Sequence, residues 1–401
     1  MGTCLFFALP YHGHIYPCLP ILEELARRNE TVVAFSTRDF EVALRSAGAE
    51  FRELPHAHTD TRALVTMAHW QLQVVKQRMP QLMREAHKMG ANYVLVDAAC
   101  HWGYVLAQVL SLPVVVLHTT VPSVFLDISH FRSIAIDLWR VPGVWSTVIR
   151  FLGLDYYLSR RWRTTRLRSP IALVQPREAT LQLVLTHECM RPSHAANSYE
   201  FVGPCVRRGN WIPADSLPAD IGKPLVYVSL GTIWNRRMDF YAQCIEAFAN
   251  TEYQLLISIG AQGDARLLPA LPANVLLRSH VDQVSVLALA SAFISHCGMS
   301  SLTEAMVAGV PMVLFPQAND QFSLTESAVR RGIAVCLPPG RASATTIYEA
   351  TQRVVRDPAI QLACRQCRQE MGRGGDAAVR AADRILRVPH LPMKMRGYAG
   401  S

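Results

Sequence analysis

The chain has 401 residues, of which 50% are hydrophobic and 18% charged, and its formal net charge is +9 at pH 7. This length indicates two or three domains, and the composition excludes a disordered chain; no apolar run reaches the roughly 18–20 residues that would cross a bilayer. The positive charge is not accompanied by a zinc-finger spacing, an RNP-like aromatic motif or a helix-turn-helix pattern, so we expect no nucleic-acid partner.

The first half of the chain alternates strands and helices. Short apolar runs and helical spacings follow one another in the order strand, helix, strand, helix, strand, which is typical of a parallel doubly wound sheet. We expect strands at 4–9, 31–37, 50–54, 93–96, 114–117, 181–186 and 200–202, and helices at 15–28, 39–47, about 63–88 and 101–110.

Residues 207–223 interrupt this alternation, because they are rich in proline, glycine and aspartate. A second alternation follows, so we predict two Rossmann-like α/β domains, 1–206 and 224–388, with 207–223 as their linker and 389–401 as a tail. In the second domain we expect strands at 225–230, 254–259, 275–278, 292–295, 310–315 and 333–337, and helices at 240–249, 284–289, 300–308, 321–331, 345–356, 359–371 and 376–387.

Segment 293–321 combines a strand, a glycine turn, a helix and a second strand. The apolar run stops at 296–298, and Ser300 or Ser301 is expected to cap the helix. A glycine turn before a helix N-terminus offers backbone N–H groups and the positive end of the helix dipole, which together bind anions. Glu304, about one turn further along, is suited to accept the two hydroxyls of a ribose. Phosphate and ribose together predict a nucleotide.

Two strand ends in the first half carry residues suited to acid–base chemistry. His14 follows the first strand, Asp97 follows the strand 93–96, and parallel strands present their carboxyl ends at one edge of a sheet. An imidazole can deprotonate an alcohol, and a carboxylate commonly orients it. We therefore pair His14, as base, with Asp97. The alternative, that each side chain merely caps a helix, is equally compatible with the pattern alone.

These motifs resemble the family 1 glycosyltransferases, and within them the bacterial macrolide-type branch. The resemblance covers nearly the whole chain and implies the GT-B fold, in which two Rossmann-like domains face each other across a cleft. It also implies that His14 is the base, that 1–206 binds the acceptor and that 224–388 binds a nucleotide sugar. The landmarks that carry it are 11–17, 201–204, 228–232, 280–283, 296–321 and 374–378.

The resemblance further implies a donor site in the second domain. The matched residues are Gly231, Thr232, His296, Gly298, Ser300 and Ser301 for the diphosphate, Glu304 for the ribose, His280, Val281 and Gln283 for the base, and Asp320 and Gln321 for the sugar hydroxyls.

Three matched positions depart from the family pattern. Ser300 stands where an asparagine is more common. The base-recognition segment, normally Trp-Val-Pro-Gln, has His280 for the tryptophan and Asp282 for the proline. An imidazole stacks on a base with less area than an indole, and Asp282 offers a carboxylate that could accept from the base edge. The choice between uridine and thymidine donors therefore stays open.

Segment 119–170 interleaves aromatic residues with arginines. In the family this region forms much of the acceptor pocket, and such a wall suits a bulky apolar acceptor. Two alternatives stay open: an amphipathic lip in peripheral contact with a membrane, with a lipid as acceptor, and ordinary helices that pack their aromatic side chains inward.

We therefore predict an inverting hexosyltransferase that uses a UDP- or dTDP-linked sugar and glycosylates a hydroxyl of a hydrophobic small molecule such as a natural product. The absence of an Asp-x-Asp motif leads us to expect no metal ion, and we expect no cofactor beyond the sugar donor. Ten irregularly spaced cysteines indicate reduced thiols and a cytoplasmic location. The rival interpretations are transfer to a membrane lipid and a non-catalytic auxiliary protein that binds sugar nucleotides.

Overall fold

The computed structural model describes residues 2–54, 63–121, 179–191, 197–207, 222–232, 235–260, 263–317, 320–337, 340 and 342–388. Most of the predicted linker, most of the aromatic segment 119–170 and the whole predicted tail lie outside these residues. The chain divides into two compact units, one made of Met1–Cys205 with Asp376–Ser401 and the other of Val206–Gly375.

The first unit contains a seven-stranded parallel sheet. Its strands are β1 (Thr3–Phe7), β2 (Thr31–Ser36), β3 (Glu50–Glu53), β4 (Tyr93–Asp97), β5 (Val114–His118), β6 (Leu181–Val184) and β7 (Glu200–Phe201). They lie in the order β3-β2-β1-β4-β5-β6-β7, which is the order of a doubly wound Rossmann-like sheet. Its helices include α1 (His12–Ile15), α2 (Leu19–Arg27), α3 (Glu41–Ser46), α4 (Ala63–Lys88) and α5 (His101–Leu110).

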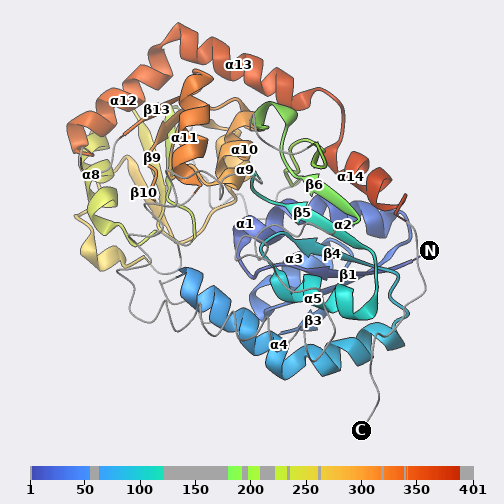
Figure 1. Ribbon diagram of the computed structural model, residues 1–401. Helices are drawn as coiled ribbons and strands as arrows, with labels where there is room; N and C mark the ends of the chain where they lie inside the picture. The colour runs from blue at the N-terminus through green and yellow to red at the C-terminus, as the bar shows by residue number, and fades with distance from the viewer. Residues whose placement is uncertain are drawn as a thin grey trace. The chain divides into compact units, whose positions relative to one another are not determined.

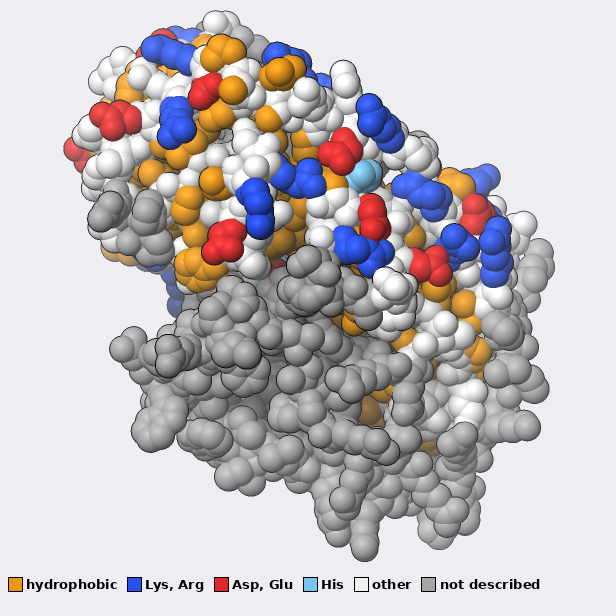
Figure 2. Space-filling view, turned by 45° about the horizontal axis from the view of Figure 1, so that its top comes forward, with side chains coloured by type: hydrophobic (Ala, Val, Ile, Leu, Met, Phe, Trp, Pro, Cys, Tyr) orange, Lys and Arg blue, Asp and Glu red, His pale blue; other side chains and the backbone are white. Residues whose placement is uncertain are grey.

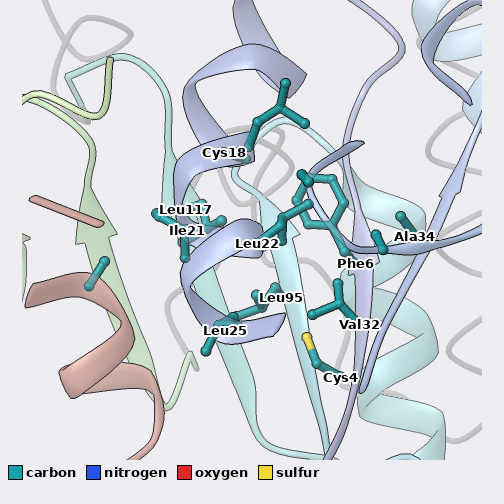
Figure 3. Packing of buried hydrophobic residues seen from close by; sticks show 14 of the residues in the cluster. Cys4, Phe6, Cys18, Ile21, Leu22, Leu25, Val32, Ala34, Leu95 and Leu117 are labelled. Atoms are coloured by element: carbon teal, nitrogen blue, oxygen red, sulfur yellow. The ribbon is translucent and has the colours of Figure 1, made fainter. Parts of the chain in front are cut away.

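Both faces of this sheet are buried, because successive residues of a strand point to opposite sides. In β1, Phe7 packs in the layer that contains α4 and α5, whereas Phe6 packs in the layer that contains α2 and α3. Figure 3 shows this second layer, in which Leu22 and Leu25 of α2 lie close to Phe6 and Leu95. The two layers hold the carboxyl ends of the strands, and the loops after them, in place.

The single helix predicted at 15–28 was wrong. The structure has α1, then a 3-10 turn at Tyr16–Cys18, then α2. Pro17 lies in the 3-10 turn and Pro20 in the first turn of α2. Because proline has no N–H to donate, a continuous α-helix through both positions would lose hydrogen bonds. As a result, His14 lies in a separate short helix directly after β1.

The second unit contains a six-stranded parallel sheet in the order β10-β9-β8-β11-β12-β13, again the doubly wound order. Its strands are β8 (Leu225–Ser229), β9 (Gln254–Ser258), β10 (Val275–Arg278), β11 (Ala290–Ser295), β12 (Met312–Leu314) and β13 (Ala334–Cys336). Its helices are α8 (Met238–Phe248), α9 (Gln283–Leu287), α10 (Met299–Ala308), α11 (Gln321–Arg330), α12 (Ala344–Arg356) and α13 (Pro358–Gly372), and Figure 1 shows how they surround the sheet.

The last helix, α14 (Ala377–Ile385), is grouped with the first unit, whereas the pattern of the sequence placed it at the end of a domain 224–388. Its alanines and Ile385 are buried in the core layer of α2. Arg380 Nε donates to the carbonyl oxygen of Val202 at 2.9 Å. The apolar spacing of a helix shows that one face is buried, but it does not show which part of the protein covers that face. The spacing in the sequence therefore could not reveal that α14 packs on the first unit.

The surface of the described residues carries mixed charge. In the space-filling view, basic side chains are interspersed with acidic ones over α12 and α13, and they do not form one continuous patch (Figure 2). This pattern is typical of a solvated surface. No helix in the described ranges is both long enough and apolar enough to span a membrane.

Candidate active site

His14 and Asp97 meet at the carboxyl end of the first sheet. His14 lies in α1 after β1, and Asp97 is the last residue of β4, which pairs with β1. Nδ1 of His14 lies 2.8 Å from Oδ2 of Asp97, and the two side chains are 25% and 1% exposed, respectively. A buried carboxylate this close to Nδ1 favours the tautomer with its proton on Nδ1. Nε2 is then the basic atom of a partly exposed ring.

Two further residues lie beside this pair, and the strand pattern alone did not single them out. Oγ1 of Thr119 lies 3.4 Å from Nδ1 of His14 and donates to Oδ1 of Asp97 at 3.4 Å. His118 is buried with Nε2 at 3.2 Å from Oε1 of Gln182, and burial lowers the pKa of His118 to about 4, against smaller opposing effects of Gln182 and Asp97. His118 is the last residue of β5 and Thr119 follows it. Because β5 is the neighbour of β4, the strand-end rule could have found both residues.

The helix of the predicted anion site begins earlier than expected. Its N-cap is Gly298, so Ser300 and Ser301 lie within the first turn of α10, and the prediction that one of them caps it was wrong. The turn Cys297-Gly298 accounts for this, because Cys297 adopts φ 63° and turns the chain before the serines are reached. A glycine N-cap has no side chain to occupy the first N–H groups of the helix, which suits anion binding.

His296 is enclosed by two glycines. A Cβ atom at Gly231 would lie 2.6 Å from Cε1 of His296, and one at Gly298 would lie 2.5 Å from Nε2. Burial lowers the pKa of His296 to about 4, against a smaller opposing effect of the Ser229 backbone. The imidazole is therefore neutral at pH 7 and offers hydrogen bonds without a positive charge. Thr232, which follows Gly231, is exposed.

Replacing Gly231 by alanine is expected to displace His296 and to weaken binding of nucleoside diphosphates about tenfold or more. Gly231 has φ +76°, so the change also carries a backbone cost of about 1–2 kcal/mol. Gly90→Ala is the matched control, because Gly90 has φ +62° but no atom within 4 Å of the added Cβ. Isothermal titration with uridine and thymidine diphosphate measures the effect. Equal affinity in both variants would show that the contact with His296 does not matter.

Gln283 connects α9, α10 and β8. Its Nε2 donates to Oε2 of Glu304 at 2.7 Å and to Oγ of Ser301 at 3.2 Å, while the hydroxyl of Tyr227 donates to its Oε1 at 3.3 Å. Both ends of the amide are thus engaged, which determines its orientation. The structure thereby brings together three residues to which the resemblance gave separate roles at the base, the diphosphate and the ribose.

Glu304 ionises near neutral pH. Its pKa is raised to about 7, chiefly by burial and secondarily by the negative charge of Asp282, whereas Gln283 and Arg207 act in the opposite direction. Because a carboxylate accepts ribose hydroxyls better when ionised, binding at this position should depend on pH.

The segment 280–283 presents its side chains in alternate environments. His280 is exposed, and Val281 is buried. Asp282 is buried as well; its Oδ1 lies 3.1 Å from Nη2 of Arg207, and its Oδ2 accepts from Oγ of Ser285 at 2.6 Å. Since both carboxylate oxygens already have partners, Asp282 is poorly placed to read the edge of a base, although the exposed imidazole of His280 remains suited to stack on one.

Asp320 and Gln321 lie at the start of α11, after β12. Gln321 is buried, and its Oε1 accepts from the backbone N–H of Gln317 at 2.8 Å. Asp320, beside it, is partly exposed.

Asn235 supports the glycine loop and has no counterpart in the sequence predictions. It is buried, and its Nδ2 donates to the carbonyl oxygen of Gly231 at 3.1 Å. A Cβ at Gly260 would lie 2.0 Å from the same nitrogen. Lone asparagines are common in loops, so no local signal marks this one.

The chain is similar to known glycosyltransferases over nearly its whole length. Residues 242–376 match the family described as erythromycin biosynthesis protein CIII-like, C-terminal domain. The chain is 27% identical to NDP-glycosyltransferase YjiC of Bacillus subtilis (strain 168), with 94% of each chain covered, and 28% identical to demethyllactenocin mycarosyltransferase of Streptomyces fradiae, with 96% of this chain and 86% of that one covered.

A solved structure extends the similarity to the fold. The crystal structure of the glycotransferase of kitacinnamycin matches with a TM-score of 0.80 and 27% identity, and the match covers 97% of this chain and 99% of that one. Both doubly wound sheets therefore have their counterparts in a known enzyme. Together with the two Rossmann-like units, these similarities support a family 1 glycosyltransferase of the GT-B fold and of the bacterial natural-product type.

Proposed function

We propose that this enzyme transfers a hexose from a uridine- or thymidine-diphosphate sugar to a hydroxyl of a hydrophobic small molecule, with inversion at the anomeric carbon and without a metal ion. The first unit binds the acceptor and the second binds the donor. The contact between His14 and Asp97 carries the proposal, because it supplies an oriented base at the carboxyl end of the first sheet.

In this reaction His14 acts through Nε2. It takes the proton of the acceptor hydroxyl as the acceptor oxygen attacks the anomeric carbon, and the bond from that carbon to the diphosphate oxygen breaks on the opposite face. A single displacement of this kind converts an α-linked donor into a β-glycoside. Asp97, 2.8 Å from Nδ1, stabilises the imidazolium that forms.

The leaving diphosphate is held by the N-terminus of α10 and by His296, Ser300, Ser301 and Thr232. Because His296 is neutral at pH 7, it stabilises the developing charge as a hydrogen-bond donor, and the helix dipole supplies the electrostatic part. Glu304 holds the ribose, His280, Val281 and Gln283 contact the base, and Asp320 with Gln321 holds the hexose.

The acceptor class is supported by similarity. One relative is named a demethyllactenocin mycarosyltransferase and another an oleandomycin glycosyltransferase, so both are named for natural products. A lipid acceptor has no comparable support. All ten cysteines are free thiols, and a reducing cytoplasm suits such a protein.

Thermal denaturation with a panel of uridine- and thymidine-diphosphate sugars, in EDTA, tests the donor. A ligand at 100 times its dissociation constant should add about 2.7 kcal/mol to the free energy of unfolding. Stabilisation by one nucleotide class in EDTA supports the proposal and names the donor. No stabilisation by any of them, or stabilisation only after Mg²⁺ is added, contradicts it. Co-sedimentation with vesicles then separates a small-molecule acceptor from a lipid.

A further inference from the structure

A largely buried ion pair lies next to the proposed ribose and base residues and is not part of them. Nη2 of Arg207 lies 3.1 Å from Oδ1 of Asp282, and their side chains are 15% and 7% exposed. The two residues are 75 positions apart in the chain. Arg207 is near the start of the second unit, and Asp282 directly precedes α9. A buried pair of this kind is retained only when its geometry is good, because both charges lose hydration.

Asp282 does not act as an ordinary helix cap. It occupies the N-cap position of α9, yet its side chain accepts no hydrogen bond from the backbone of that helix. Its carboxylate is engaged by Arg207 at one oxygen and by Ser285 Oγ at the other. The guanidinium of Arg207 therefore balances its negative charge directly.

The pair influences Glu304 through one intervening residue. Gln283 follows Asp282 in the chain, and its Nε2 donates to Glu304 at 2.7 Å. Asp282 and Glu304 are thus linked through Gln283, and their like charges oppose each other's ionisation. Arg207 offsets this repulsion: Asp282 raises the pKa of Glu304, and Arg207 lowers it.

Other titratable groups nearby contribute little charge at neutral pH. Tyr227 on β8 is also coupled to Glu304, but its pKa is raised, chiefly by burial, so it remains a neutral phenol. The pKa of His280 is lowered, chiefly by partial desolvation of its ring, so its imidazole is neutral above pH 7. Among the described residues that act on Glu304, Asp282 and Arg207 therefore supply the charges.

We propose that Arg207 is a positioning residue of the donor site: by pairing with Asp282 it holds the segment that carries Gln283 and favours the ionised form of Glu304, which accepts the ribose hydroxyls. The proposal rests on the assignment of Glu304 to the ribose. It assigns to Arg207 no contact with the donor. The buried carboxylate of Asp282 is what makes such a compensating cation necessary in this chain.

The test is the dissociation constant of uridine and thymidine diphosphate between pH 6 and 9, in the full chain and in Arg207→Gln. If loss of the cation raises the pKa of Glu304 by about one unit, binding at pH 7 becomes about fivefold weaker, and the loss disappears near pH 9. The double variant Arg207→Gln with Asp282→Asn removes both charges and is expected to restore the wild-type pH profile to within about twofold. A loss of equal size at every pH, or no loss at all, overturns the proposal.

Two controls separate this inference from the proposed function. Arg266→Gln breaks an exposed pair with Asp264 in the same unit and should leave the pH profile unchanged. A second readout needs no ligand: the gain in melting temperature from Glu304→Gln grows as the pH rises from 4.5, and the pH at which this gain levels off reports the folded-state pKa of Glu304. This pH should move upward in the Arg207→Gln background even if no nucleotide binds. If it does not move, Arg207 has no effect on Glu304. If it moves but neither nucleotide binds the wild type, only the proposed function fails.

Discussion

Replacing His14 by alanine is expected to lower kcat by roughly 10²- to 10⁴-fold, the usual contribution of a general base. The affinity for the nucleoside-diphosphate donor should stay the same, because the proposed donor residues all lie in the second unit. Asp97→Asn should lower kcat as well, since an amide that presents its N–H to Nδ1 favours the wrong tautomer. Steady-state kinetics with the donor found by thermal denaturation, combined with titration of the bare nucleotide, separates the two quantities.

His12 offers a matched control in the same short helix. Its ring stacks on Tyr16, with centroids 5.0 Å apart, and meets Phe40 edge to face at 5.3 Å. His12→Ala therefore removes an imidazole from α1 without removing the ring that contacts Asp97, and its kcat should stay within a few-fold of wild type. Similar losses of kcat in both variants would mean that α1 matters only for structure, and the assignment of His14 as base would have to be abandoned.

The second large effect is expected at Glu304, where function and stability oppose each other. The folded-state pKa of Glu304 is about 7, against an ordinary value of 4.5. Between pH 4.5 and pH 7, Glu304 keeps its proton in the folded protein but loses it in the unfolded chain. The free energy of unfolding therefore falls as the pH rises through this window, and above pH 7 the penalty reaches about 3 kcal/mol.

Glu304→Gln should remove this penalty. We expect it to raise the melting temperature at pH 8 and to leave it unchanged near pH 4.5, where the native side chain is already neutral. Binding of uridine or thymidine diphosphate at pH 8 should become about 10- to 100-fold weaker, because hydrogen bonds to a charged acceptor are lost. Glu246→Gln, on the exposed face of α8, serves as control and should change neither quantity much. A lower melting temperature for Glu304→Gln at pH 8 would contradict the burial penalty.

The repeated strand–helix pattern was enough to predict both doubly wound sheets. Fully buried parallel strands such as β4 and β8 appear in the sequence as continuous apolar runs, and the helices between them show the spacing of one buried face. Most predicted ends of strands and helices therefore differ from the observed ends by about one or two residues. The predicted helix 15–28 failed because apolar spacing was given more weight than Pro17 and Pro20. The predicted cap at Ser300 or Ser301 failed because the turn at Cys297 and Gly298 starts α10 earlier.

The parts of the site that depend on local order along the chain could be predicted. Residues directly after parallel strands gather at one sheet edge, and this geometry was sufficient to suggest that His14 and Asp97 lie together. Thr119 and His118 obey the same rule and were missed only because no chemistry was sought at the end of β5.

The sequence by itself determined the class of fold, the sheet edge at which each polar residue lies and the glycines around the anion site, because these follow from periodicity and backbone conformation within short segments. Only the tertiary structure decided that α14 packs on the first unit, that Arg207 pairs with Asp282 and that Gln283 bridges Ser301 to Glu304. These contacts join distant positions, and the pKa values of Glu304 and His296 depend on burial by many neighbours at once. No local sequence pattern predicts these contacts or these pKa values, because long-range pairing and desolvation are properties of the folded chain.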